Sequence, residues 1–153
     1  MLYVAYGSNM NLEQMKYRCP YSTVKGKGKL KGWKLVFNVH ADVIKGKKND
    51  EVPVVLWDID DSDWKRLDKY EGCPFYYIKK NIKVKTDSGK TVDAIIYVMT
   101  NKRKGICPPS REYFNICKTG YMENGINTCY LYDALEFAVE NETIYNQYNI
   151  RKR

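Results

Sequence analysis

The 153-residue sequence predicts an α+β fold in which helices lie against a strongly curved, barrel-like sheet. Residues 75–86 and 90–100 alternate in polarity on either side of Asp87-Ser88-Gly89, a pattern typical of two strands joined by a tight turn. Residues 52–59 form a nearly continuous apolar run, which indicates a strand buried on both faces. The predicted strands are mostly neighbours along the chain and the longer helices come late, which favours the α+β class.

The chain begins with a predicted strand, a tight turn and a short helix. Residues 2–6 are apolar and aromatic, and they stop at Gly7-Ser8-Asn9. Leu12 and Met15 then follow with helical spacing. The turn is therefore expected to connect the first strand directly to a helix.

The next segment mixes irregular and extended stretches. Glycines and lysines dominate residues 24–32 and indicate an irregular connection. WKLVFNV, residues 33–39, has the composition of a strand. Residues 44–51 are expected to form an exposed loop.

Three further helices are predicted. Asp61 or Ser62 can cap the start of the first, and Gly72 ends it. The second covers residues 110–119 and is closed by Gly120. The third covers residues 129–141, with an inward face made by Leu131, Leu135, Phe137 and Ala138.

Length and composition favour one domain covering residues 1–153. No apolar run approaches the ~20 residues that span a bilayer, and no basic stretch precedes an apolar segment at the N-terminus, so a soluble, cytoplasmic protein is expected. The five cysteines have scattered spacings, which disfavours a disulfide framework or a zinc site. His40, the one histidine, sits in an alternating stretch and is interpreted as an ordinary strand-end residue.

The formal charge of +8 comes mostly from lysine, in segments such as KGKGKLKGWK and the terminal RKR. No RNP-type aromatic motif, zinc-finger spacing or heptad zipper accompanies this charge, so it is interpreted as a solvated surface and no nucleic-acid partner is predicted. A positive surface could also attract acidic small molecules or an acidic carrier protein.

Tyr6-Gly7-Ser8-Asn9 is the first candidate site. Glycine permits a sharp turn and a close approach by a ligand, and the N–H groups entering a helix attract an anion such as a carboxylate or phosphate. A strand-to-helix turn also needs a glycine and a capping serine for structural reasons alone.

Glu71 is the second candidate. Trp64, Leu67 and Glu71 stand at i, i+3 and i+7 of the predicted helix, so the carboxylate shares a face with the apolar anchors. Burial and the negative end of the helix dipole would both raise the pKa of Glu71, as a group that exchanges protons near neutrality requires. The alternative is a glutamate that reaches solvent or pairs with a lysine.

Tyr113 is the third candidate. Tyr113 and Cys117 are at i and i+4 of the predicted helix over residues 110–119, which places a phenol beside a small thiol. With 14 tyrosines in the chain, any one of them more often has a packing role than a functional one.

These signals occur together in four blocks: YGSNM (6–10), LDKYEG (67–72), IYVMTN (96–101) and PPSREYFNICKTGYMENGI (108–126). In this order they resemble the γ-glutamylcyclotransferase family. The resemblance implies a small mixed β-barrel with peripheral helices, often dimeric, with no metal or cofactor. It implies that a small-molecule γ-glutamyl amide cyclises to 5-oxoproline with Glu71 as general acid/base. The substrate-binding residues that it implies are Tyr3, Val4, Ala5, Tyr6, Gly7, Ser8, Asn9 and Tyr113.

Two alternatives stay open. The first is a related cyclotransferase acting on γ-glutamylamines or on a carrier-linked γ-glutamyl group, because residues 23–52 show little of the family pattern and the surface is positive. The second is a protein without catalytic activity, either a binding module with the same pocket or a basic nucleic-acid binder. Glu71 argues against the binding module.

Overall fold

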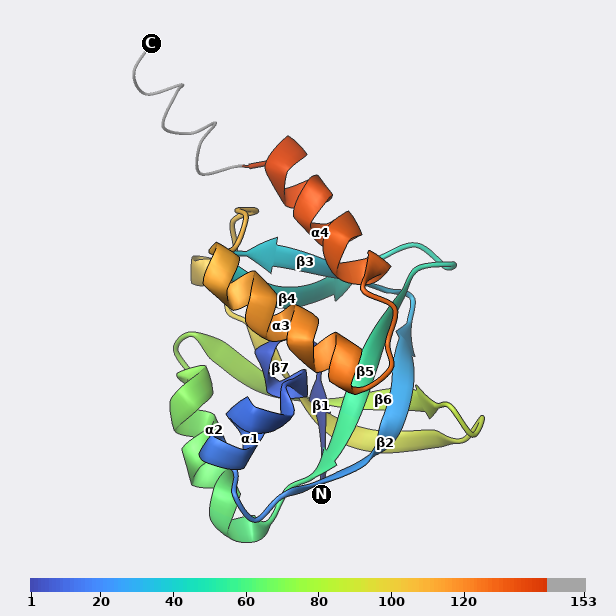
Figure 1. The fold of residues 1–153 in the computed structure, drawn as a ribbon, viewed down its shortest axis with the longest axis vertical. Coiled ribbons are helices and arrows are strands. Elements are labelled where there is room, and N and C mark those ends of the chain that lie inside the picture. Colours follow the sequence, from blue (N-terminus) through green and yellow to red (C-terminus); the bar gives the residue numbers. More distant parts are fainter. Residues whose placement is uncertain (143–153) are drawn as a thin grey trace.

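The computed structural model describes residues 1–142, so the basic residues 151–153 and the end of the predicted domain lie outside the described part. Five of the strands close into a barrel in the order β1-β5-β2-β6-β7, and β3 and β4 form a separate ribbon (Figure 1). The strands are β1 (Leu2–Ala5), β2 (Thr23–Lys31), β3 (Trp33–Asn38), β4 (His40–Lys45), β5 (Glu51–Asp58), β6 (Tyr77–Thr86) and β7 (Thr91–Met99). The helices are α1 (Leu12–Arg18), α2 (Trp64–Glu71), α3 (Arg111–Glu123) and α4 (Cys129–Glu140), with 3-10 turns η1 (Ser8–Met10), η2 (Asp61–Asp63) and η3 (Asn101–Arg103).

The barrel is mixed because β1 pairs in two directions. It runs antiparallel to β5 and parallel to β7, where Tyr3 faces Ile95 and Val4 faces Ile96. The helices lie on the outside, with α1 beside α2 and α4 against β3 (Figure 1). The predicted α+β fold, a small mixed β-barrel with peripheral helices, is confirmed.

The strongest sequence patterns gave correct elements. β6 and β7 pair from Tyr77 with Met99 to Lys85 with Thr91, around a turn in which Gly89 has a φ of 88°. β5 is buried along nearly its whole length, between β1 and β2. α2 ends at Gly72, whose left-handed conformation matches the predicted stop signal.

The prediction of an irregular connection over residues 24–32 is wrong, because this segment is β2. It pairs with β5 along its length and with β6 at Gly28 and Lys29, and a bulge lies between Val24 and Gly26. A Cβ at Gly28 would lie 2.6 Å from the Lys85 carbonyl oxygen. Glycine here allows a close approach between strands, so it does not mark a loop.

The predicted loop over residues 44–51 is shorter in the structure. β4 continues to Lys45 and β5 begins at Glu51, which leaves residues 46–50 as the connection. The strand predicted over residues 33–39 ends one residue early, at Asn38. Val39 then turns the chain with a φ of 68° into β4, so His40 lies at the start of a strand.

The prediction that Gly120 closes a helix is also wrong. α3 continues past it to Glu123, and a Cβ at Gly120 would lie 2.6 Å from the Asn11 nitrogen and 2.7 Å from the Met10 carbonyl carbon. Glycine therefore lets α3 pack directly on the backbone after η1. Side-chain amides reinforce this contact, since Asn11 Nδ2 donates to the Ile116 carbonyl and Asn124 Nδ2 to the Met10 carbonyl.

None of the helices within residues 1–142 is long and apolar enough to cross a bilayer. The last helix agrees with its prediction, since Leu131 and Ala138 of α4 are buried while Leu135 and Phe137 are partly buried.

Gly120→Ala should destabilise the protein by about 1–3 kcal/mol, because the added methyl group forces α3 away from the backbone of Met10 and Asn11. In an unconstrained helix interior the same change stabilises by about 0.5–1 kcal/mol. Urea unfolding measures the difference, and Gly26→Ala is the matched control because a Cβ at Gly26 meets nothing within 4 Å. A Gly120→Ala variant at least as stable as the parent would contradict this packing.

Candidate active site

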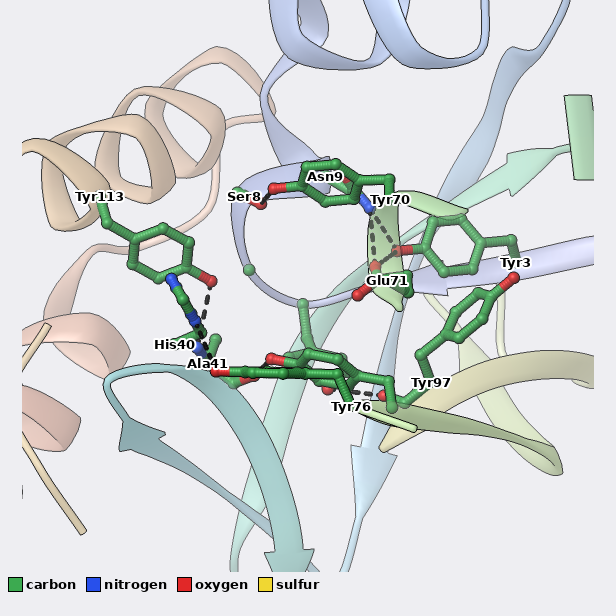
Figure 2. A pocket seen from close by; sticks show the side chains of 13 residues that line it. Tyr3, Ser8, Asn9, His40, Ala41, Tyr70, Glu71, Tyr76, Tyr97 and Tyr113 are labelled. Carbon is green, nitrogen blue, oxygen red and sulfur yellow. Dashed lines mark hydrogen bonds between the residues drawn. The ribbon is translucent and has the colours of Figure 1, made fainter. Parts of the chain in front are cut away.

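A cavity of about 270 Å³ opens between the end of β1, the end of α2 and the start of α3. Figure 2 shows Glu71 and Asn9 on one side of it and His40 and Tyr113 on the other. Segments distant in sequence meet here because the barrel brings the ends of its strands together. The lining residues are Tyr3, Tyr6, Gly7, Ser8, Asn9, His40, Ala41, Tyr70, Glu71, Tyr76, Tyr77, Tyr97 and Tyr113.

The Glu71 carboxylate is held by two neutral groups. Asn9 Nδ2 donates to Glu71 Oε1 at 3.0 Å, and the Tyr3 hydroxyl donates to the same oxygen at 3.4 Å (Figure 2). Asn9 Nδ2 also donates to the Tyr3 hydroxyl at 2.9 Å, so the three side chains form a closed triangle. Each donor satisfies part of the hydrogen-bonding capacity of the carboxylate without supplying a positive charge.

Burial raises the pKa of Glu71 to about 7. The side chain is surrounded by protein except where it opens into the cavity, and this loss of water disfavours the charged form. The charge of Arg18 and the hydrogen bond from Tyr3 lower the pKa, but burial dominates. A carboxyl group with this pKa can accept and return a proton at neutral pH.

The turn after β1 approaches Glu71 through Asn9 and approaches α3 through Gly7. A Cβ at Gly7 would lie 2.9 Å from Ala41 Cβ and 3.2 Å from the Tyr113 hydroxyl oxygen, so only glycine fits here without a shift. Gly7 precedes η1 and gives it no side-chain cap. Ser8 Oγ lies 3.2 Å from the Tyr70 hydroxyl.

Tyr113 closes the opposite side of the cavity. Its side chain is partly buried, and its hydroxyl oxygen accepts a hydrogen bond from the Ala41 N–H at 3.1 Å. Cys117, one turn further along α3, is fully buried beside Tyr113, and burial raises the pKa of its thiol to about 12. The predicted phenol–thiol face is confirmed, and the thiol is protonated at neutral pH.

His40 lines the cavity, which its position in the sequence did not indicate. Its Nδ1 lies 3.0 Å from the Tyr76 hydroxyl, and its ring meets the Tyr113 ring edge to face at 4.8 Å. Partial burial lowers the pKa of His40, which favours the neutral imidazole at pH 7.

Four lining tyrosines were not identified from the sequence, namely Tyr70, Tyr76, Tyr77 and Tyr97. The Tyr6 hydroxyl donates to the Tyr97 carbonyl at 2.6 Å, and the Tyr77 hydroxyl donates to the Ala41 carbonyl at 2.8 Å. The Tyr97 hydroxyl donates to Asp68, one turn before Glu71 on α2. The signal that could have found Tyr70 and Tyr97 is their presence in the LDKYEG and IYVMTN blocks.

The structure brings together most of the residues that the sequence indicated. Tyr3, Tyr6, Gly7, Ser8, Asn9, Glu71 and Tyr113 all line the cavity. Val4 and Ala5 do not, because their side chains are buried in the barrel core. Within residues 1–142, no group of three or more His, Cys, Asp or Glu side chains is arranged to hold a metal ion.

Comparison with known proteins agrees with the fold and the sequence blocks. Residues 3–115 match the family model described as "Gamma-glutamyl cyclotransferase, AIG2-like". The human protein named gamma-glutamylcyclotransferase is 33% identical over 137 residues, covering 82% of this chain and 72% of the relative, and the cattle protein of the same name is 32% identical with the same coverage. A solved structure titled "Gamma-glutamyl cyclotransferase" superposes with a TM-score of 0.76 at 30% identity, over 88% of this chain and 85% of that one. The chain therefore belongs to the γ-glutamyl cyclotransferase, AIG2-like family.

Proposed function

We propose that this protein is a γ-glutamylcyclotransferase that converts a γ-glutamyl amide to 5-oxoproline and a free amine, with Glu71 as the general acid/base. The proposal rests on the Glu71 carboxyl, which faces a small cavity. This carboxyl has a pKa of about 7 and accepts hydrogen bonds from two neutral donors. The names of the human and cattle relatives support the reaction class.

The substrate carries its own nucleophile, the α-amine. Its nitrogen forms a bond to the γ-carbonyl carbon, and the bond from that carbon to the amide nitrogen then breaks. A five-membered lactam results. Binding the γ-glutamyl group with its α-amine next to its γ-carbonyl therefore supplies much of the rate enhancement. No water is consumed, because the leaving amine is released as the ring closes.

Glu71 moves protons from the α-nitrogen to the departing nitrogen. At neutral pH the α-amine is an ammonium ion, which must lose a proton before it can attack. The ionised Glu71 accepts that proton and then donates it to the departing nitrogen. The α-nitrogen loses a second proton as it becomes the lactam N–H, and the released amine takes up a proton to leave as an ammonium ion. Its raised pKa suits both steps, because a carboxyl of ordinary pKa is a weak base near neutrality.

The turn after β1 and Tyr113 are proposed to bind the γ-glutamyl group. The N–H groups of residues 6–8 would face the substrate carboxylate or the developing oxyanion, and one such donor is typically worth about 3 kcal/mol. Tyr3 and Asn9 would act through Glu71, and Tyr113 would orient the substrate on the opposite side. Val4 and Ala5 would contribute through the backbone of β1.

Cleavage of the amide bond can be followed for any leaving group. Release of 5-oxoproline is measured across γ-glutamyl amino acids, γ-glutamyl peptides and γ-glutamylamines at equal concentration. The proposal expects 5-oxoproline and amine in equal amounts from at least one of these classes. Release of free glutamate in place of 5-oxoproline would indicate hydrolysis and contradict it.

Glu71→Gln should lower kcat by at least about a hundredfold, because the amide cannot carry the proton. The variant should remain folded and, at pH 8, be more stable than the parent by about 1–2 kcal/mol, because the parent buries a charge there. Near-normal turnover by Glu71→Gln would reject the role assigned to Glu71. Urea unfolding at pH 8 and at pH 5 provides the stability comparison.

The sign of that stability difference depends on pH. The folded-state pKa of Glu71 lies above its ordinary value of about 4.5, so the protonated form is favoured by folding. The parent therefore loses stability as the pH rises from about 4.5 to about 7, and the advantage of Glu71→Gln should shrink at pH 5. An advantage that is equal at both pH values would mean that Glu71 ionisation is not its source.

The acid limb of the pH profile of kcat/KM should report the pKa of Glu71 in the free enzyme. Activity should fall as the pH drops through about 7, because protonated Glu71 cannot accept the substrate proton. The profile is measured with a γ-glutamyl amide whose own α-amine titration is determined separately. A limb near pH 4.5 would show that Glu71 keeps an ordinary pKa.

A further inference from the structure

Arg18 connects three parts of the site without lining the cavity. It is the last residue of α1, and its Nη1 donates to Asn9 Oδ1 at 2.5 Å while Nη2 donates to Gln14 Oε1. Its guanidinium carbon lies 3.6 Å from the centroid of the Tyr70 ring, next to Glu71 on α2. One side chain therefore joins α1, the turn after β1 and the end of α2.

These contacts determine how the Asn9 amide is oriented. A guanidinium group has only donors, so the Asn9 atom that faces Arg18 must be the carbonyl oxygen. The NH₂ group then points the other way, toward Glu71 Oε1 at 3.0 Å and the Tyr3 hydroxyl at 2.9 Å (Figure 2). With the amide reversed, its oxygen would face the carboxylate and repel it.

We propose that Arg18 is a positioning residue for the Glu71 base, and that it acts by fixing the Asn9 amide so that its NH₂ group faces the ionised carboxylate. This inference rests on the proposed function for the claim that Glu71 is the base. The linkage among the three side chains rests on their geometry alone. Arg18 does not touch the substrate and is not a catalytic residue.

Electrostatics act in the same direction. The Arg18 charge lowers the pKa of Glu71 and so opposes part of the rise caused by burial. Five titratable side chains that interact with Glu71 are uncharged at pH 7, because burial raises the pKa of each. They are Tyr3 and Tyr6 at the end of β1, Cys19 after α1, Tyr77 of β6 and Tyr97 of β7. Asp68, one turn earlier on α2, is paired with Lys79 at 3.0 Å. Removing Arg18 thus withdraws the positive charge that lowers the pKa of Glu71.

The alternative is that Arg18 only fastens α1 to α2 through its contact with Tyr70. That role would affect folding but would not move the titration of Glu71. Arg18→Met separates the two, because it keeps an unbranched apolar side chain beside Tyr70 and removes the charge and both donating nitrogens. Arg18→Lys restores the charge and one donating nitrogen in place of two. Arg66→Met is the matched control, since Arg66 is an exposed arginine of α2.

The first measurement needs no substrate. The Glu71 side-chain carboxyl is labelled with ¹³C and titrated by NMR, with Glu71→Gln identifying its signal. We expect Arg18→Met to raise the midpoint by about one pH unit, Arg18→Lys to restore most of the difference and Arg66→Met to change little. An unchanged midpoint in folded Arg18→Met would overturn the proposal. If Arg18→Met does not fold, Arg18→Gln makes the same test, because it is also uncharged and its amide allows Asn9 to face either way.

The second measurement follows 5-oxoproline release against pH. Arg18→Met should lose about three- to tenfold in kcat/KM at pH 7 and recover toward the parent value above about pH 8.5, where Glu71 is ionised in both. A loss of the same size at every pH would overturn the proposal in favour of a structural role. Failure of the parent to release 5-oxoproline, together with the expected shift in the NMR titration, would reject the proposed function and leave the linkage of Arg18 to Glu71 intact.

Discussion

Burial of one carboxyl group, Glu71, is the constraint on which the rest of the site depends. In water a glutamate is a weak base at neutral pH, and in a dry interior it would simply stay protonated. The structure gives this group an intermediate environment, with protein on most sides, an opening into the cavity, and donors from Asn9 and Tyr3 on one oxygen. The result is a pKa of about 7, raised by burial and held back by the Arg18 charge and the Tyr3 hydrogen bond.

The barrel brings these groups together. β1 lies between β5 and β7, so the turn that follows it is anchored on both sides and delivers Asn9 to the end of α2. α3 packs against the same turn, and it can approach the turn closely because Gly120 has no side chain. The Trp57 indole donates to the Asn9 carbonyl at 3.0 Å and holds the turn to β5. Packing of the fold and positioning of the carboxylate therefore use the same contacts.

Much of the fold could be predicted where the pattern is periodic. The hairpin of β6 and β7, the buried strand β5 and the inward face of α2 with Glu71 all follow from spacing and turn residues. β2 and the position of Gly120 inside α3 could not be predicted, because glycine was interpreted as a break in local secondary structure. At Gly28 and Gly120 its role is to admit a second backbone, which only the tertiary structure reveals. His40 and Arg18 were missed for a related reason, since their roles come from contacts with residues distant in sequence.

Catalysis by Glu71 requires that residue 71 meets the α-amine of a γ-glutamyl group inside this cavity. A crystal structure of Glu71→Gln with a bound γ-glutamyl amide would locate that amine, because slowed turnover preserves the substrate. We expect the α-amine nitrogen about 3 Å from the residue 71 side chain, with the γ-glutamyl group between Gly7 and Tyr113. A ligand bound outside the cavity, or one whose α-amine points away from residue 71, would rule out Glu71 as the base.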